Sequence, residues 1–90
     1  MNKTIITVVG KDTVGIIARV CSFLAESNVN ILDISQTIVQ EYFNMMMIVD
    51  MAGSSMPFDE VSERLANIGK DLGVQVKCQR EEIFDMMHRI

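Results

Sequence analysis

The sequence lacks most of the features that identify a chemical role at first sight. Its two cysteines, Cys21 and Cys78, are far apart and form no C-x-x-C pair. Each lies in an apolar context, so we expect two buried free thiols. The single histidine, His88, lies two residues from the end of the chain, where a solvent-exposed side chain is the common case. We therefore expect no metal site and no cofactor.

The sequence also has no run of basic residues and no long apolar run. The net charge is −4 and there is no basic run, so the phosphate backbone of a nucleic acid has no electrostatic partner here. No apolar stretch approaches the roughly 18 to 20 residues of a membrane span. The chain starts directly with strand-like residues and shows no basic signal region. From these absences we expect that the chain binds no nucleic acid and no membrane. A cytoplasmic location is the default expectation.

Apolar residues, by contrast, are abundant for a chain of this size. They make up 49 % of its 90 residues, and the mean hydropathy is +0.25. A chain this short forms one domain and buries roughly 60 to 65 % of the surface that its unfolded form exposes. Because a small domain cannot hide so much apolar surface by itself, a second copy of the chain is the expected cover. We therefore expect a homodimer.

Apolar spacing predicts the first half of the fold. Residues 4–9 are apolar on both faces, as in a central strand. Over residues 15–27 the apolar positions recur every three or four residues, which predicts a helix. Residues 29–39 and 42–51 predict two strands joined by a short turn, hence an antiparallel hairpin. The first of these alternates irregularly near Leu32, as a bulge there would cause.

The second half repeats the pattern. Pro57 is suited to the first position of a helix, which Gly73 ends. Residues 74–80 alternate cleanly between apolar and polar, as an edge strand does. The order β-α-β-β-α-β predicts an α+β, ferredoxin-like sandwich over residues 1–80, with an antiparallel sheet in the order 4-1-3-2 and two helices on one face. Residues 81–90 predict a short C-terminal helical extension.

Three activities hosted by this fold do not suit the residues. A soft-metal chaperone needs thiolates after the first strand, and that turn has no cysteine. An RNA-binding sheet stacks bases on aromatic side chains, which the first strand lacks. An acylphosphatase-like enzyme is the remaining catalytic alternative, with Asn44 placed to orient a water molecule. Its phosphate site would need an arginine, and Lys11 is the only cation in the turn. We expect no enzymatic activity.

The turn between the first strand and helix carries a specific resemblance. The run Val9-Gly10-Lys11-Asp12-Thr13-Val14-Gly15-Ile16-Ile17-Ala18-Arg19-Val20 resembles the opening of ACT domains, a strand followed by G-x-D-x-x-G-[IL] and a helix. Asn30-Ile31 also resembles the family pattern at the start of the second strand. Val14 is a departure, since many ACT domains have proline there. The length and the ending resemble the small stand-alone ACT proteins of unassigned function.

The resemblance implies a regulatory module that binds a small ligand, such as an amino acid, as a homodimer. The ligand would lie between the first turn of one subunit and the second strand of another. Backbone N–H groups at the helix start suit a carboxylate, and Asp12 and Asn30 suit an ammonium group. The expected ligand-binding residues are Gly10, Asp12, Thr13, Val14, Gly15, Ile16, Asn30 and Ile31.

Two alternatives stay open from the residues. Asp12 and Thr13 also suit capping of the helix, and Gly15 suits close packing of helix on sheet, so the turn has a purely structural interpretation. The whole chain could likewise be a ligand-free module for protein assembly that contacts an unidentified protein partner. The methionines at positions 45–47 are expected to be core and interface residues.

Overall fold

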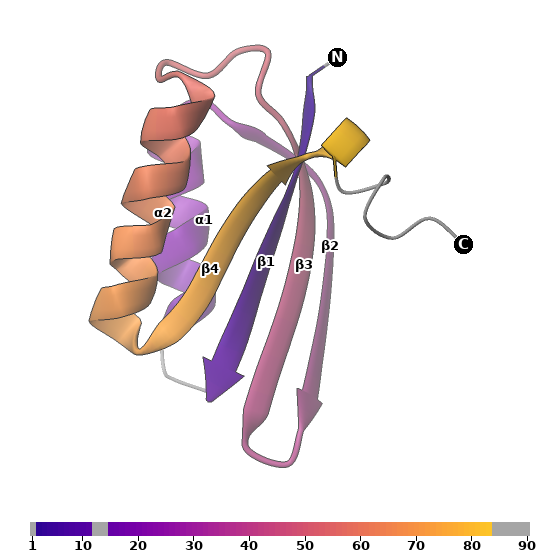
Figure 1. Cartoon of the computed structure of the whole chain (residues 1–90), viewed down its shortest axis with the longest axis vertical. Helices are drawn as coiled ribbons and strands as arrows, with labels where there is room; N and C mark the ends of the chain where they lie inside the picture. Colours follow the sequence, from indigo (N-terminus) through magenta and orange to yellow (C-terminus); the bar gives the residue numbers. More distant parts are fainter. Residues whose placement is uncertain (1, 12–14, 84–90) are drawn as a thin grey trace.

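The structure is a computed structural model that describes residues 2–11 and 15–83. Its elements follow the predicted order of strands and helices (Figure 1). They are β1 (Lys3–Lys11), α1 (Ile16–Glu26), β2 (Asn30–Val39), β3 (Tyr42–Asp50), α2 (Phe58–Leu72) and β4 (Val74–Arg80).

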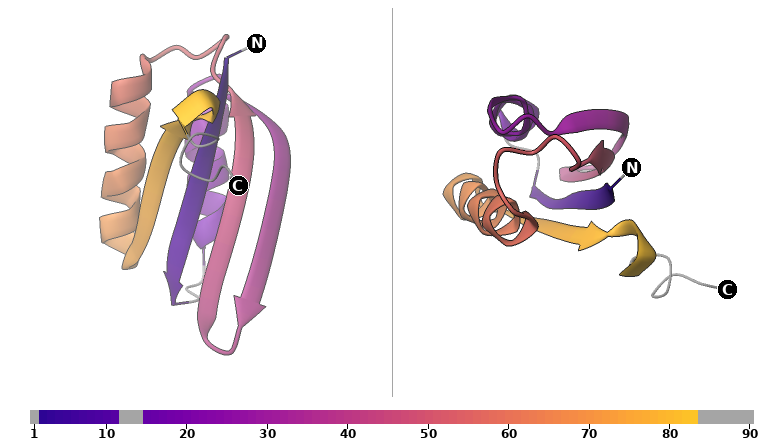
Figure 2. Two further views of the ribbon diagram at one scale, coloured as in Figure 1. Left: turned by 45° about the vertical axis from the view of Figure 1, so that its right-hand side comes forward. Right: turned by 90° about the horizontal axis from the view of Figure 1, so that it is seen from above.

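The four strands form one antiparallel sheet in the order β2-β3-β1-β4, which confirms the predicted α+β, ferredoxin-like topology. Both helices lie on the same face of this sheet (Figure 2). The predicted bulge is present, because the register of β2 against β3 shifts between Ile31 and Asp33. The sheet therefore has one face covered by helices, one open face, and two edges formed by β2 and β4.

The predicted ends of elements differ from the observed ones by one or two residues. β1 continues to Lys11 because its ladder with β3 extends past the apolar run, pairing Gly10 with Phe43 and Lys11 with Tyr42. Pro57 precedes α2 as its N-cap instead of opening the helix, with an extended backbone at ψ 160°. These shifts arise because strand ladders and caps depend on backbone partners, which the apolar pattern does not contain.

The core lies between the helices and the two central strands. Ile6 and Val8 of β1 are fully buried, as are Met45 and Met47 of β3. From the helices, the buried side chains are Ile16, Val20, Leu24, Val61 and Leu65. Met46 alternates onto the open face of the sheet and is 40 % exposed. Two of the three central methionines are therefore core residues, and the third is available to a partner.

Asn28 follows α1 in the left-handed conformation, with φ 58°, which asparagine adopts more readily than most residues. The Val29 N–H donates to the Leu24 carbonyl at 2.9 Å, and the Asn28 N–H donates to the Ala25 carbonyl at 3.1 Å. This is the Schellman arrangement, which satisfies carbonyls left open at the helix end. It turns the chain directly into β2.

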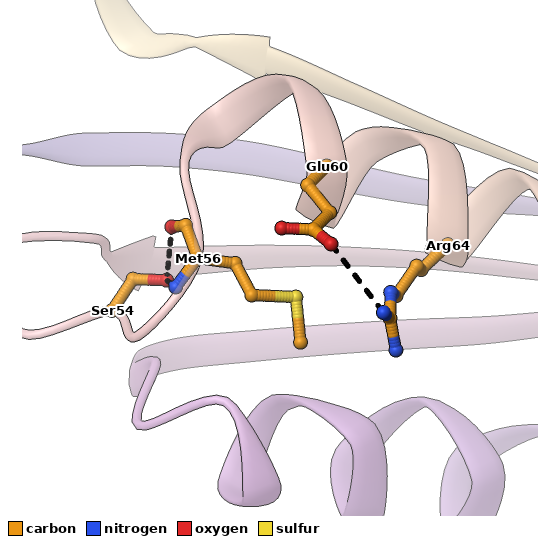
Figure 3. Close-up of polar contacts among 4 residues, drawn as sticks. All are labelled: Ser54, Met56, Glu60 and Arg64. Atoms are coloured by element: carbon orange, nitrogen blue, oxygen red, sulfur yellow. Dashed lines mark hydrogen bonds and ion pairs between the residues drawn. The ribbon is translucent and has the colours of Figure 1, made fainter.

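The entry into α2 is held by local polar contacts (Figure 3). The Ser54 hydroxyl donates to the Met56 carbonyl at 2.7 Å and accepts from the Met56 N–H at 3.2 Å. One turn into the helix, Arg64 contacts Glu60 at 3.4 Å across the exposed surface. Surface pairs of this kind contribute well under about 1 kcal/mol, so they fix geometry more than stability.

Two glycines allow three elements to meet at Val74. A Cβ atom on Gly10 would lie 2.8 Å from Val74 Cγ1, and one on Gly69 would lie 2.7 Å from the Val74 carbonyl oxygen. Both separations are shorter than side chains tolerate. A glycine in a helix interior normally weakens the helix, but here the missing side chain of Gly69 lets α2 pack onto β4.

Residues 81–83 continue beyond β4 in helical conformation. Residues 84–90, which hold most of the predicted C-terminal helix and His88, lie outside the described residues. The helical extension over 81–90 and the domain boundary at residue 80 stay predictions.

Gly69→Ala is expected to destabilise the fold by about 1–3 kcal/mol, although alanine in a helix interior is normally more favourable than glycine. The reason is the clash of the new methyl group with the β4 backbone. Urea unfolding at fixed protein concentration measures the effect. Gly53→Ala is the matched control, since its Cβ would meet only the Asn28 carbonyl oxygen at 3.6 Å. A Gly69→Ala protein as stable as the wild type would contradict this packing role.

Candidate ligand-binding turn

The turn between β1 and α1 ends at Gly15, which is the N-cap of α1 and has a left-handed backbone, φ 90°. The Arg19 N–H donates to the Gly15 carbonyl at 2.9 Å, the first bond of the helix. The N–H groups of Ile16, Ile17 and Ala18 precede that bond and have no intrahelical acceptor. They are suited to an anionic group, and no acidic side chain lies in the first turn of α1. Asp12, Thr13 and Val14 lie outside the described residues.

Gly10 and Ile16 have structural roles that their place in the pattern does not reveal. Gly10 packs its backbone against Val74, and Ile16 is only 2 % exposed, within the core. Ile16 can therefore offer a ligand its N–H group but not its side chain. Gly15 differs from both, because it is exposed and a Cβ there would meet nothing within 4 Å. Its positive φ is what favours glycine.

Asn30 and Ile31 begin β2. Asn30 is exposed and lies opposite Asp50 in the sheet, while Ile31 is partly buried against the core. The Asp50 carboxylate accepts hydrogen bonds from the N–H groups of Ala52 at 3.0 Å and Asn2 at 3.2 Å. The bond from Ala52 and then that from Asn2 lower the pKa of Asp50. Asn30 thus has an ionised carboxylate beside it on β3 at neutral pH.

Within one copy of the chain, the two halves of the expected site lie at opposite ends of the sheet. Lys11, next to the turn, pairs with Tyr42, whereas Asn30 pairs with Asp50 at the other end of β3. Tyr42 and Asp50 are eight positions apart, which is about 27 Å of extended strand. In Figure 1 β1 ends at the bottom of the view and β2 begins at the top. One copy of the chain does not bring these residues together.

The cation nearest to the turn in the helix is Arg19. Its guanidinium group lies 3.6 Å from the Asp71 carboxylate of α2, and both side chains are largely exposed. The sequence interpretation did not include Arg19 among the site residues. The sequence signal that could have pointed to Arg19 is its position in the first turn of the predicted helix, close to the expected site. Its pairing with Asp71 offsets part of its positive charge near the turn.

Both cysteines are free thiols that pack against the core. Burial raises the pKa of the Cys78 thiol to about 11, with a hydrogen bond to Ser62 acting weakly in the opposite direction. Burial also raises the pKa of Cys21. Neither thiol therefore has the low pKa that a nucleophilic or metal-binding cysteine needs.

Within residues 2–11 and 15–83, no three His, Cys, Asp or Glu side chains are grouped as a metal site would require. The same part of the chain has no helix that could span a membrane.

Comparisons with known proteins place this geometry in a family. The sequence model of the ACT domain matches residues 2–79. A UPF0237 protein of Bifidobacterium longum is 63 % identical over 90 residues, which is the full length of both chains. The structure of an ACT domain protein from Streptococcus pneumoniae superimposes with a TM-score of 0.80 at 42 % identity, covering 93 % of this chain and 94 % of that one.

A more distant structure shares the fold. It is the regulatory subunit of aspartate kinase from Thermus thermophilus, with a TM-score of 0.67 at 24 % identity. The match covers 88 % of this chain and 51 % of that subunit.

We expect Cys78 to resist alkylation at pH 8 in the folded protein. With a pKa of about 11 the thiol is almost entirely protonated there, and the thiolate is the reactive form. Unfolding in urea should return the pKa toward about 8.5 and accelerate the reaction more than about a hundredfold. Iodoacetamide labelling followed by peptide mass spectrometry separates Cys78 from Cys21. Rapid labelling of Cys78 without unfolding would contradict the assignment.

Proposed function

The chain belongs to the ACT domain family, and on that basis we propose that it is a cytoplasmic homodimeric sensor that binds a small amino acid. ACT domains are regulatory modules that bind small ligands, and the proposal adds the ligand class and the dimer. The main observation in its support is the strand-to-helix turn. Gly15 is the left-handed N-cap of α1, and the first N–H groups of the helix have no acceptor within the helix. The protein would regulate by binding and release, without catalysis.

A zwitterion suits the residues at the two halves of the site. The N–H groups of Ile16 to Ala18 would bind the carboxylate, with about 0.3–1 kcal/mol from the helix dipole. Asp12 and the side-chain oxygen of Asn30 would accept from the ammonium group. The neighbouring Asp50 carboxylate adds negative potential on the Asn30 side. Thr13, Val14, Gly10 and Ile31 would shape the walls around the ligand.

The distance between the two halves supports a shared site. Because the turn and Asn30 are about 27 Å apart in one chain, a ligand that contacts both must lie between two copies. Exposed apolar side chains on β2 give a second copy a surface to cover, and Ile34 and Ile38 are 43 % and 56 % exposed. The protein that responds to ligand binding would be a separate partner. The distantly similar Thermus thermophilus protein is likewise named as a regulatory subunit, that of aspartate kinase.

A ligand-free assembly module is the second candidate. The observation that favours it is the structural role of Gly10 and Ile16, which accounts for part of the sequence pattern without any ligand. Exposed Val9 and Met46 on the open face of the sheet would then be contact surface. The two candidates differ in whether an amino acid stabilises the protein.

A thermal-shift screen of the twenty amino acids separates the two candidates. At a hundredfold excess over Kd, a true ligand should add about 2.7 kcal/mol of stability. Asp12→Ala and Asn30→Ala should each abolish most of that shift, whereas Asn67→Ala, an exposed asparagine of α2, should preserve it. If no amino acid shifts the wild type, or if both site variants shift as it does, the ligand assignment is wrong.

Ile38→Glu should convert the dimer to a monomer, since a charge on β2 would be placed against a second copy. Sedimentation at micromolar concentration measures the mass. Met46→Glu introduces the same charge on the open face and should leave the dimer intact. A monomeric wild type would refute the shared site, and a dimer lost only in Met46→Glu would move the interface to the open face.

A further inference from the structure

An open groove runs between the end of α2 and the free edge of β4. Its volume is about 640 Å³. On the α2 side it is lined by Ala66, Gly69 and Lys70, and on the β4 side by residues 73–77; Val9 of β1 also lines it. Gly69, which packs closely against Val74 and Val76 of β4, forms part of the wall of this groove. It is separate from the turn and from Asn30.

Two lysines of this groove have no acidic partner in the described part of the chain. Lys70 and Lys77 both line it, both are exposed, and neither forms an ion pair with a described residue. By contrast Lys3, Arg19 and Arg64 each lie within 4.0 Å of a carboxylate. In a chain with a net charge of −4, two unpaired cations on one groove form a local positive site.

The strand beside the groove is an edge strand. Within the described residues β4 pairs with β1 alone, so its outer N–H and C=O groups face away from the sheet. Gln75 and Lys77 alternate with buried Val74 and Val76. An edge of this kind accepts an additional strand, whose side chains alternate between the two faces of the sheet.

We propose that this groove binds an extended acidic segment of a partner protein, which pairs with β4 as a fifth strand. Backbone hydrogen bonds to β4 would hold the segment, and its carboxylates would contact Lys70 on the helix face and Lys77 on the open face. Ala66 of α2 and Val76 of β4, which line the groove, supply apolar contact for its uncharged side chains. An open groove along a strand suits an extended chain better than an enclosed small molecule.

Fluorescence anisotropy with two labelled peptides tests this proposal. One repeats the order glutamate-glutamate-valine-valine, which places carboxylates on both faces of an added strand, and the other has lysine in place of each glutamate. The glutamate peptide should bind the full-length protein, more weakly as salt increases, and the lysine peptide should not. Lys70→Glu/Lys77→Glu should weaken the glutamate peptide about tenfold or more and create affinity for the lysine peptide. Amide NMR signals of residues 74–77 should shift on binding.

The matched control is Arg19→Glu/Arg64→Glu, which changes the net charge equally and breaks only two exposed ion pairs. It should keep the affinity for the glutamate peptide, which shows that the groove and not overall charge selects it. Failure of the glutamate peptide to bind would overturn the proposal. So would equal weakening by both double variants, or full displacement of the peptide by free glutamate at the same carboxylate concentration, which would indicate a small-anion site.

Discussion

The close approach of three backbones at Val74 is the constraint on which the rest of the structure depends. β1 reaches Val74 through Gly10, and α2 reaches it through Gly69. A methyl group at either glycine would push β4 away from its neighbours. The contact fixes the end of β1, from which the chain enters the turn, and it also forms the wall of the groove beside β4. One packing detail thus positions both surfaces to which we assign binding.

That contact also gives a physical connection between the two surfaces. Gly10 lies only two positions before Asp12, and its partner Val74 lines the groove. A ligand that shifts the turn would act on Val74 through a contact with no spare room, because tightly packed groups transmit displacement. The two edges of the sheet then have separate tasks. In the two proposals, β2 would contribute Asn30 and the dimer surface, and β4 would bind the partner protein.

The fold could be predicted because its information is local. Apolar alternation in the strands, three-and-four spacing in the helices, and Asn28 and Gly73 at helix ends all specify their elements without knowledge of distant residues. The roles of Gly10 and Gly69 could not be predicted in the same way. They depend on how closely Val74 approaches in space, and a glycine in sequence does not name its neighbour. The groove with Lys70 and Lys77 was missed for the same reason.

The candidate site was predicted only in part. The sequence placed Gly15 at a helix start and Asn30 at a strand start, as the structure does, and the resemblance grouped Gly10, Ile16 and Ile31 with them as expected ligand-binding residues, which stay predictions. Packing gives Gly10 and Ile16 clear structural roles, and Ile31 packs partly against the core. Antiparallel register, which no local pattern contains, places the turn and Asn30 at opposite ends of the sheet.

Mixed dimers test the central claim, a site shared between two copies, most directly. Asp12→Ala and Asn30→Ala chains are purified separately, combined, and titrated with the amino acid that stabilises the wild type. A mixed dimer contains one site with both wild-type halves, so the account predicts that calorimetry recovers binding at one ligand per dimer, although neither variant binds alone. Absence of binding in the verified mixed dimer would contradict it, because a site contained within one chain would be damaged in both subunits.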